Sequence, residues 1–445
     1  MGSPGGWDYQ RMAQEIGRIA WKAIKEKAGL DIELDFDDPI LNPVPNFADL
    51  LLRAHKIRYP EKAPYIALVA EKETLSKVGE NIRFVEFLNK MPGVKAVLAE
   101  PSQLRLKDGE IYLNGNKLTT IFIDFNNNVI IKLRKKYGIE ALLAAIKKGI
   151  VVNPRGMEPL GAKGVFEGIT SEYKDILSPT TVRRTPWTRQ FYRRKTTGPH
   201  DERINDLVRW TEENWKDVIL KPVHGYSGQG IIIGKKEKDK KKSIHYALKA
   251  GDYIVQQFVP LENWTEEFPW IDREKKRLFL KKWQTDFRCF ITDKGLIGFV
   301  TRFGGIPTNV GAGGGIQSTA ILRSEIELRK AKDIINSSIL KLGFKAMLRL
   351  QNELDQKSLE IGSVYLLGPI KCTLRPRIIT TEQVDSIQKY ASNLWDDALL
   401  LEQLWLEGKL KKYVQISEEE DEIARLAPWR GGPALMASDG LFGFR

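Results

Sequence analysis

Two short apolar runs with a helical stretch between them restrict the possible fold more than any other part of the sequence. The runs at residues 65–70 and 94–99 have the length and composition of buried strands, and residues 82–89 between them have helical spacing. Strand, helix and strand in this order form a βαβ unit, in which the two strands lie parallel. The alternation continues with a strand at 120–125, a helix at 138–148 and a strand at 150–154. The sequence therefore predicts an α/β domain built on a parallel sheet.

The composition is typical of a globular protein outside a membrane. The 445 residues include 70 Lys and Arg and 57 Asp and Glu, which gives a net charge of +13. No apolar run approaches the ~20 residues that span a bilayer. Cys289 and Cys372 alone cannot build a disulfide framework or a thiolate zinc site. Because the first residues also lack a secretory signal, we expect a cytoplasmic protein, and its basic excess suits an anionic ligand.

The patterns along the chain predict four consecutive stretches. These are an N-terminal helical segment (1–60) that begins with an amphipathic helix, the α/β domain (61–177), a second domain with recurring strands (178–345), and a mostly helical C-terminal region (346–445). The expected fold class is therefore α/β and α+β. A helix at 381–407 carries Trp395 and Trp405 on an apolar face, which belongs either to the core or to a contact in a homo-oligomer.

A lysine at the end of a predicted strand precedes a loop that is rich in glycine. Lys221 follows three apolar residues, and the loop contains Gly225, Tyr226, Ser227, Gly228 and Gly230. An ammonium beside free backbone N–H groups is suited to hold a polyphosphate. The loop is neither a Walker A sequence nor a dinucleotide turn, because no Gly-Lys-Ser/Thr follows and the next predicted element is a strand. A plain β-hairpin with a glycine turn is the alternative.

A further predicted strand, residues 253–259, ends close to a carboxylate. Gln257, Phe258 and Val259 form the end of this strand, and Glu262 comes shortly after it. A strand end of this kind can hydrogen-bond adenine through its backbone, and a carboxylate there can reach a ribose hydroxyl. The segment therefore favours a nucleotide site over a plain hairpin.

Asp286 and Arg288 lie two residues apart in another predicted strand, so they share one face of it. A carboxylate is a magnesium ligand and a guanidinium binds a transferred phosphate, so the pair suits phosphoryl transfer. Arg302 near the end of the next predicted strand adds a second arginine, and Asn309 adds a side-chain carbonyl before the glycine run at 311–315. We expect Arg288 and Arg302 to be catalytic and Asp286 and Asn309 to bind a metal.

The order of these segments resembles the ATP-grasp fold. Leu-Lys-Pro with a glycine loop is followed by Val-Gln-Gln-Phe-Val, Asp-Phe-Arg, a strand ending in Arg-Phe-Gly-Gly and a triple glycine. More narrowly, the chain is similar to the circularly permuted ATP-grasp proteins related to glutathionylspermidine synthase, through Asp108-Gly109, the strand ending at Asp124, and Asn153-Pro154 with Lys163 after it. The resemblance implies a pre-ATP-grasp α/β domain at 61–177 followed by an ATP-grasp domain at 178–345.

The resemblance also implies a role for each candidate residue. Lys221 would contact the nucleotide phosphates, the loop from Gly225 to Gly230 would be a flap over them, residues 257–259 would line adenine and Glu262 the ribose. Asp286 would bind Mg²⁺ and Arg288 the γ-phosphate. The implied activity is ATP-dependent carboxylate-amine ligation, in which the carboxylate becomes an acyl phosphate that an amine opens. The sequence departs from the family where a Glu-x-Asn pair should complete the magnesium site, since none follows residue 330.

Two other classes of function stay open. The missing Glu-x-Asn pair favours a nucleotide-binding ATP-grasp-like protein without ligase activity. A nucleic-acid-binding protein is less favoured, because the lysine run at 235–242 has mixed charges and no aromatic residues and is interpreted as a solvated turn. The basic aromatic segment at 183–195 either contacts an anion or packs as an aromatic plug. We expect small-molecule or peptide carboxylates and amines as partners, rather than nucleic acid or a membrane.

Overall fold

The computed structural model describes residues 5–75, 78–225, 229–306, 308, 310–365, 368–427 and 432–440. The chain divides into two compact units, each assembled from separated stretches. The first unit comprises Met1–Gly2, Pro154–Pro260 and Asn393–Gly431, and the second comprises Ser3–Asn153, Leu261–Ser392 and Gly432–Arg445. The four consecutive stretches expected from the sequence stay a prediction.

A three-stranded parallel sheet forms the α/β part of the second unit. Its order is β3 (Lys95–Ala99), β2 (Tyr65–Val69), β7 (Thr120–Ile123), with Ile66 paired to both Ala96 and Thr120. The central strand is apolar along its whole length because sheet neighbours cover both its edges and other elements cover both its faces. The predicted βαβ unit is thus confirmed, with α4 (Gly79–Asn89) as its crossover helix.

The prediction of a strand at residues 150–154 is wrong. Only an isolated bridge joins Val151 to Ile121, because the side chain of Asn153 takes over the pairing: its Oδ1 accepts from the N–H of Ile123 at 3.0 Å and its Nδ2 donates to the carbonyl of Ile123 at 2.7 Å. Pro154 then has no N–H with which to continue a ladder.

Further helices and a small antiparallel sheet complete this part of the chain. Aromatic rings hold α1 and α2 on it, with ring centroids of Trp7 and Phe47 4.9 Å apart and of Trp7 and Phe122 5.4 Å apart. The helices are α1 (Trp7–Ala28), as predicted, α2 (Pro43–Arg58), α3 (Lys72–Leu75), α5 (Asn127–Lys136) and α6 (Glu140–Lys148). The small sheet contains β4 (Arg105–Lys107), β5 (Glu110–Leu113) and β6 (Asn116–Lys117).

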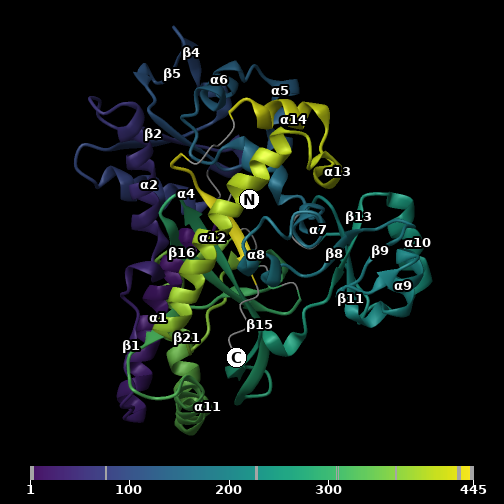
Figure 1. Ribbon diagram of the computed structural model, residues 1–445. Helices are drawn as coiled ribbons and strands as arrows, with labels where there is room; N and C mark the ends of the chain where they lie inside the picture. The colour runs from purple at the N-terminus through teal and green to yellow at the C-terminus, as the bar shows by residue number, and fades with distance from the viewer. Residues whose placement is uncertain are drawn as a thin grey trace. The chain divides into compact units, whose positions relative to one another are not determined.

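A long antiparallel sheet forms the other main part of the second unit. Its path is β14 (Thr265–Asp272), β15 (Arg277–Thr292), β16 (Gly295–Gly304) and β17 (Gly315–Ile316), and β22 (Met436–Gly440) also pairs with β15. β15 and β16 run side by side in Figure 1. The sequence did not predict β14, which contains Pro269, a residue that strands accept only at edges or bulges.

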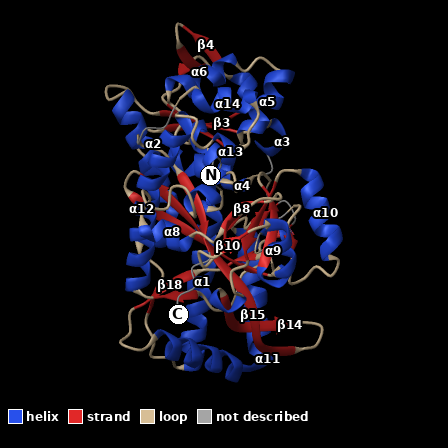
Figure 2. Ribbon diagram, turned by 45° about the vertical axis from the view of Figure 1, so that its right-hand side comes forward, coloured by secondary structure: helices blue, strands red, loops and turns tan. Residues whose placement is uncertain are grey.

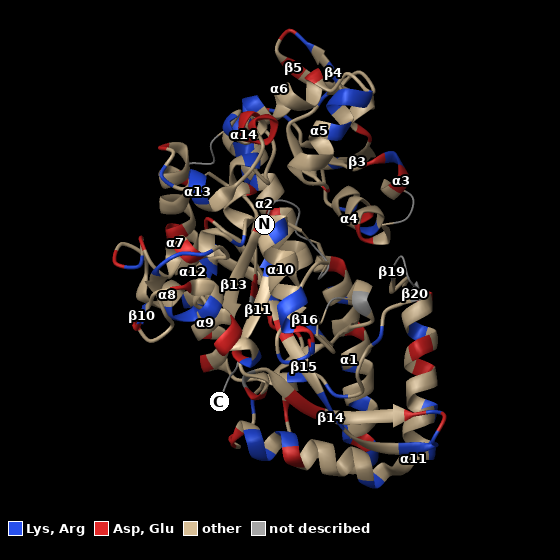
Figure 3. Ribbon diagram, turned by 90° about the vertical axis from the view of Figure 1, so that its right-hand side faces the viewer, with Lys and Arg blue, Asp and Glu red and all other residues tan. Residues whose placement is uncertain are grey.

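A third sheet and a long helix also belong to the second unit. The sheet contains β1 (Leu34–Asp35), β18 (Thr319–Leu322) and β21 (Arg377–Ile379), and a short hairpin joins β19 (Val364–Tyr365) to β20 (Gly368–Pro369). Helix α11 (Leu328–Glu360) packs against β14 and β15 (Figure 2) and is interrupted at Gly343, which has φ 79°. Both acidic and basic residues occur along this helix (Figure 3).

A four-stranded antiparallel sheet organises the first unit. Its order is β12 (Ile232–Ile233), β11 (Val218–Pro222), β13 (Tyr253–Gln257) and β8 (Thr188–Gln190). One face packs on Leu207, Ile244 and Ala247 of α9 and α10, and the other on Leu404, Trp405 and Tyr413. The apolar face that carries Trp395 and Trp405 is therefore buried within the chain.

Apart from the C-terminal part of helix α12, the remaining elements of the first unit are short. They are the hairpin of β9 (Thr196–Thr197) and β10 (Arg203–Ile204) and the helices α7 (Val165–Ile169), α8 (Pro179–Arg184), α9 (Leu207–Glu213), α10 (Lys240–Ala250), α13 (Lys411–Val414) and α14 (Glu418–Arg425). Helix α12 (Thr381–Leu406) begins in the second unit and continues in the first. The lysine run at 235–242, expected to be a turn, begins as one at residues 235–236, and only its last three residues, 240–242, belong to α10, whose N-cap Asp239 accepts from the N–H of Lys242.

The expected α/β and α+β class is confirmed, since parallel and antiparallel sheets occur together with helices at both ends of the chain. Within the described residues, none of the helices combines the length and the apolar composition that crossing a membrane requires.

Candidate functional site

Lys221 lies at the end of β11, as the sequence predicts, and its partner is a glutamine of the neighbouring strand. The Nζ of Lys221 donates to Oε1 of Gln256 at 2.7 Å, and Nε2 of Gln256 donates to Oγ1 of Thr188 at 2.8 Å. Ile219 pairs with Gln256 and Gln256 with Thr188, so all of these side chains point to one face of the sheet. Sequence reasoning chose Gln257 and missed Gln256, whose face only the register decides.

A second lysine lies close to Lys221. The Nζ of Lys163 donates to the carbonyl of Gly225 at 3.1 Å, and its backbone N–H donates to the carbonyl of Val223 at 3.0 Å. Burial, together with repulsion from Lys163, lowers the pKa of Lys221 to about 8, and burial also lowers the pKa of Lys163. Neither ammonium has a carboxylate partner among the residues that the structure describes. We call Lys163 and Lys221 the lysine pair.

Two charged groups that repel each other in a partly buried place are unfavourable without an anion, because each has lost water and gained no opposite charge. Such a pair is therefore suited to a ligand with adjacent anionic oxygens. Of the two lysines, the sequence pattern indicated only Lys221 as a phosphate ligand, and Lys163 was distinguished only by its position after Asn153-Pro154.

The glycine loop connects β11 to β12, as expected. Gly225 and Gly230 have φ 120° and 70°, and a Cβ on Gly230 would lie 2.9 Å from Cγ of Pro222. The hydroxyl of Tyr253 donates to the carbonyl of Gly230 at 2.9 Å, which fixes the far end of the loop. Tyr226, Ser227 and Gly228 lie outside the described residues, so their predicted phosphate contacts stay predictions.

The predicted adenine segment is divided between the two units. The N–H of Gln257 donates to the carbonyl of Trp187 at 2.9 Å, and the N–H of Phe258 donates to the carbonyl of Asp217 at 2.8 Å. These two N–H groups are therefore engaged by the chain itself. Val259 also belongs to the first unit, whereas Glu262 is exposed in the second. The adenine and ribose roles of these residues stay predictions.

In the second unit, Asp286 is held in a buried ion pair. Arg302 donates to both oxygens of its carboxylate, from Nε at 2.7 Å and from Nη2 at 2.8 Å, and the hydroxyl of Thr308 donates at 2.6 Å. The exposed fractions of the Arg302 and Asp286 side chains are 8% and 9%. The predicted metal ligand is thus the partner of a predicted catalytic arginine. Asn309 lies outside the described residues.

Arg288 shares a face of β15 with Asp286, as predicted, but its partner comes from the end of the chain. Nε and Nη2 of Arg288 donate to the two oxygens of Asp439 in β22 at 2.7 and 3.1 Å, and Nη1 donates to the carbonyl of Gly5 at 3.0 Å. Nη2 of Arg302 also lies 3.1 Å from Asp439. Burial would raise the pKa of Asp439, but Arg288 and Arg302 outweigh it and hold that pKa below its ordinary value. Asp286, Arg302, Asp439 and Arg288 thus form one ion-pair network.

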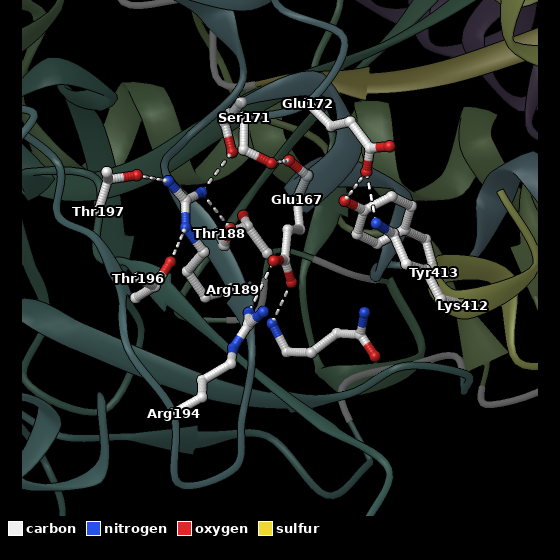
Figure 4. Close-up of polar contacts among 12 residues, drawn as sticks. Glu167, Ser171, Glu172, Thr188, Arg189, Arg194, Thr196, Thr197, Lys412 and Tyr413 are labelled. Carbon is white, nitrogen blue, oxygen red and sulfur yellow. Dashed lines mark hydrogen bonds and ion pairs between the residues drawn. The ribbon is translucent and has the colours of Figure 1, made fainter. Parts of the chain in front are cut away.

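The basic aromatic segment packs inside the first unit. Trp187 and Phe191 are buried, as the aromatic-plug interpretation predicts, whereas Tyr192 is 50% exposed. The buried guanidinium of Arg189 donates to the carbonyl of Thr188 and to three threonine hydroxyls, those of Thr170, Thr196 and Thr197 (Figure 4). These bonds fix β8 at the edge of the sheet, where Thr188 accepts from Gln256.

Comparisons with known proteins found similar chains only among solved structures. No family model and no curated protein matches the chain. Among solved structures, the chain is similar to a RimK domain ATP-grasp protein from Sphaerobacter thermophilus, with 15% identity over 61% of this chain and 96% of that one and a TM-score of 0.30. It is also similar to D-alanyl-alanine synthetase A from Vibrio cholerae, with 11% identity over 65% and 81% and a TM-score of 0.30.

A third similar structure is the D-alanine–D-alanine ligase from Bacillus anthracis, with 12% identity over 79% of this chain and 100% of that one and a TM-score of 0.29. The circular permutation and the relation to glutathionylspermidine synthase stay predictions.

Proposed function

We propose that the protein is an ATP-dependent ligase that joins a carboxylate to an amine. The observation that carries the proposal is the lysine pair, two partly buried ammonium groups without a carboxylate partner among the described residues, of which Lys221 lies on the sheet face and Lys163 donates to the carbonyl of Gly225. Adjacent phosphates offer the anionic oxygens that these groups lack. The glycine loop between β11 and β12 adds a turn whose backbone can approach a ligand closely.

ATP would supply the phosphoryl group that converts a carboxylate to an acyl phosphate, which an amine then opens to an amide with release of phosphate. The residues of the first unit would bind and orient the nucleotide. Lys221 would hold a phosphate oxygen, and Gln256 would fix the position of Lys221 through Thr188. Lys163, which is fastened to the loop at Gly225, would hold a second oxygen. Binding of this kind acts by positioning and by charge stabilisation.

The described residues do not fit the magnesium site that the resemblance implies. Both oxygens of Asp286 are engaged by Arg302 and one also by Thr308, and no group of three or more His, Cys, Asp or Glu that could hold a metal occurs among the described residues. We therefore assign no step of the reaction to a metal ion. Asp286 is better described as the structural partner of Arg302.

A second candidate is a nucleotide-binding protein without ligase activity. The ion-pair network favours it, because Arg288 and Arg302 are engaged by carboxylates of the chain and not poised for a transferred phosphate. The two candidates agree on nucleotide binding and differ only in turnover.

Calorimetric titration of the full chain with ATP, ADP and adenosine tests the binding step. If the lysine pair binds phosphates, ATP should bind more tightly than adenosine, and Lys221→Ala should weaken ATP binding about 10- to 150-fold, the equivalent of a charge-assisted hydrogen bond of about 1.5–3 kcal/mol. Lys216→Ala is the matched control, because Lys216 is an exposed lysine of the same unit. Equal ATP affinity in wild type and Lys221→Ala would contradict both candidates.

Release of ADP tests the chemical step. The full chain is incubated with ATP and with pools of amino acids, short peptides and diamines, singly and in pairs. A ligase should release ADP only when a carboxylate and an amine are present together. Nucleotide binding without ADP release from any pair would favour the second candidate.

A further inference from the structure

The C-terminal strand β22 continues an edge of β15 where β14 ends. Residues 277–284 of β15 pair with β14, and residues 287–291 pair with β22. The register sets Arg288 opposite Asp439, and opposite residues of an antiparallel pair point to the same face. The chain thereby brings a carboxylate from its last described strand to an arginine that the sequence assigns to phosphate.

Asp439 accepts hydrogen bonds from the N–H groups of Arg288 that an anionic ligand would otherwise bind. The Nε and Nη2 groups of a guanidinium form the fork that binds carboxylate or phosphate with two parallel hydrogen bonds. Asp439 fills this fork at 2.7 and 3.1 Å, and the carbonyl of Gly5 takes Nη1 at 3.0 Å. A phosphate can therefore reach the fork of Arg288 only when Asp439 leaves it.

The three ion pairs of the network differ in how easily they can open, and departure of Asp439 breaks its contacts with both Arg288 and Arg302. The side chains of Arg302 and Asp286 are 8% and 9% exposed, so opening that pair would leave two buried charges without partners. The side chains of Arg288 and Asp439 are 30% and 46% exposed, so water can replace each partner. Arg302 thus keeps Asp286 as its partner when Asp439 leaves, whereas Arg288 is able to exchange one anion for another.

We propose that Asp439 is an internal competitor for the phosphate site of Arg288, so that β22 is an autoinhibitory strand that an anionic ligand displaces. This inference rests on the proposed function only for the chemical nature of the displacing anion, which is a nucleotide phosphate. Two anions cannot share one fork, so phosphate binding repels Asp439 and releases the end of β22 from β15.

The variant Asp439→Asn removes the competing charge and keeps the size of the side chain. If Asp439 closes Arg288 in about nine of ten molecules, its removal should raise the affinity for ATP and for tripolyphosphate about tenfold, because the apparent affinity scales with the open fraction. The affinity for adenosine should stay unchanged. The gain should disappear in the double variant Arg288→Ala, Asp439→Asn.

Asp293→Asn is the matched control. Asp293 also accepts two hydrogen bonds from one arginine, Arg53, at 2.7 and 3.1 Å, but it lies outside the ion-pair network. Its removal should leave the affinity for both phosphate ligands unchanged. Lower affinity in Asp439→Asn would show that Asp439 instead positions Arg288, and unchanged affinity would show that it does not compete; either result overturns the proposal.

Hydrogen exchange of the wild-type chain gives a second measurement that needs no variant. Saturating tripolyphosphate should lower the protection of the amides of residues 438–440, at the end of β22, and unchanged protection would overturn the proposal. The outcomes also separate this inference from the proposed function. If tripolyphosphate releases β22 but ATP binds no better than tripolyphosphate, the proposed nucleotide site is refuted, whereas the role of Asp439 as a competitor is supported. If ATP binds but Asp439→Asn changes no affinity, only the role of Asp439 is refuted.

Discussion

Replacement of Lys221 by methionine should stabilise the protein without ligand at pH 7 while it removes the proposed phosphate contact. The pKa of Lys221 falls from 10.5 to about 8, which corresponds to about 3 kcal/mol of unfavourable free energy for its charged form. The change also removes the hydrogen bond to Gln256, which offsets about 1–2 kcal/mol of this gain. We expect Lys221→Met to be more stable than wild type by about 1–2 kcal/mol at pH 7.

The pH dependence of this difference follows from the lowered pKa. Below pH 8 Lys221 is charged in both the folded and the unfolded chain, so the cost of burying the charge is fully present. Between pH 8 and 10.5 the folded chain loses the proton while the unfolded chain keeps it, so the cost disappears as the pH rises. The stability advantage of Lys221→Met should therefore be largest near pH 7 and shrink towards pH 10.5.

Denaturant unfolding at pH 7, 9 and 10.5 measures this difference, and calorimetric titration with an ATP analogue measures the binding. Lys216→Met, on an exposed lysine of the same unit, should stay within about 0.5 kcal/mol of wild type at every pH. A variant that is more stable than wild type but binds the ligand more weakly indicates that the wild-type residue favours ligand binding at the expense of folding stability. A less stable Lys221→Met with unchanged ATP affinity would refute the reasoning and make Lys221 an ordinary strand-end lysine.

Three further changes test other parts of the structure. Asp286→Asn should destabilise the protein by about 3–5 kcal/mol in denaturant unfolding, because it leaves the buried charge of Arg302 without its main partner; a loss below about 1 kcal/mol would contradict the structural role. Burial raises the pKa of Glu80 to about 8, so wild-type stability should fall by a few kcal/mol between pH 4.5 and 8, and Glu80→Gln should flatten that profile; parallel profiles would contradict the burial. Lys163→Ala should weaken ATP binding in calorimetric titration by about tenfold or more but leave adenosine binding unchanged, and an equal loss for both ligands would place Lys163 away from the phosphates.

Much of the local structure and some of the site could be predicted because they depend on short-range patterns. Apolar runs and helical spacing predicted β2, α4 and β3, and the two-residue period predicted that Asp286 and Arg288 share a face. The strand expected at 150–154 failed because a side chain, that of Asn153, replaced the backbone ladder. Periodicity carries no signal for such a replacement.

The sequence by itself determined which residues of each strand share a face, and only the tertiary structure decided what each of them meets there. Lys221 is recognisable at the end of its strand, but its partner Gln256 follows from the register of β11 and β13. Arg288 is recognisable as a candidate for phosphate, but Asp439 reaches it from 151 positions away because β22 joins the edge of β15. The geometry of a single strand determines which of its residues share a face. The residue that each side chain contacts depends instead on long-range strand pairing, whose register depends on burial across the whole unit.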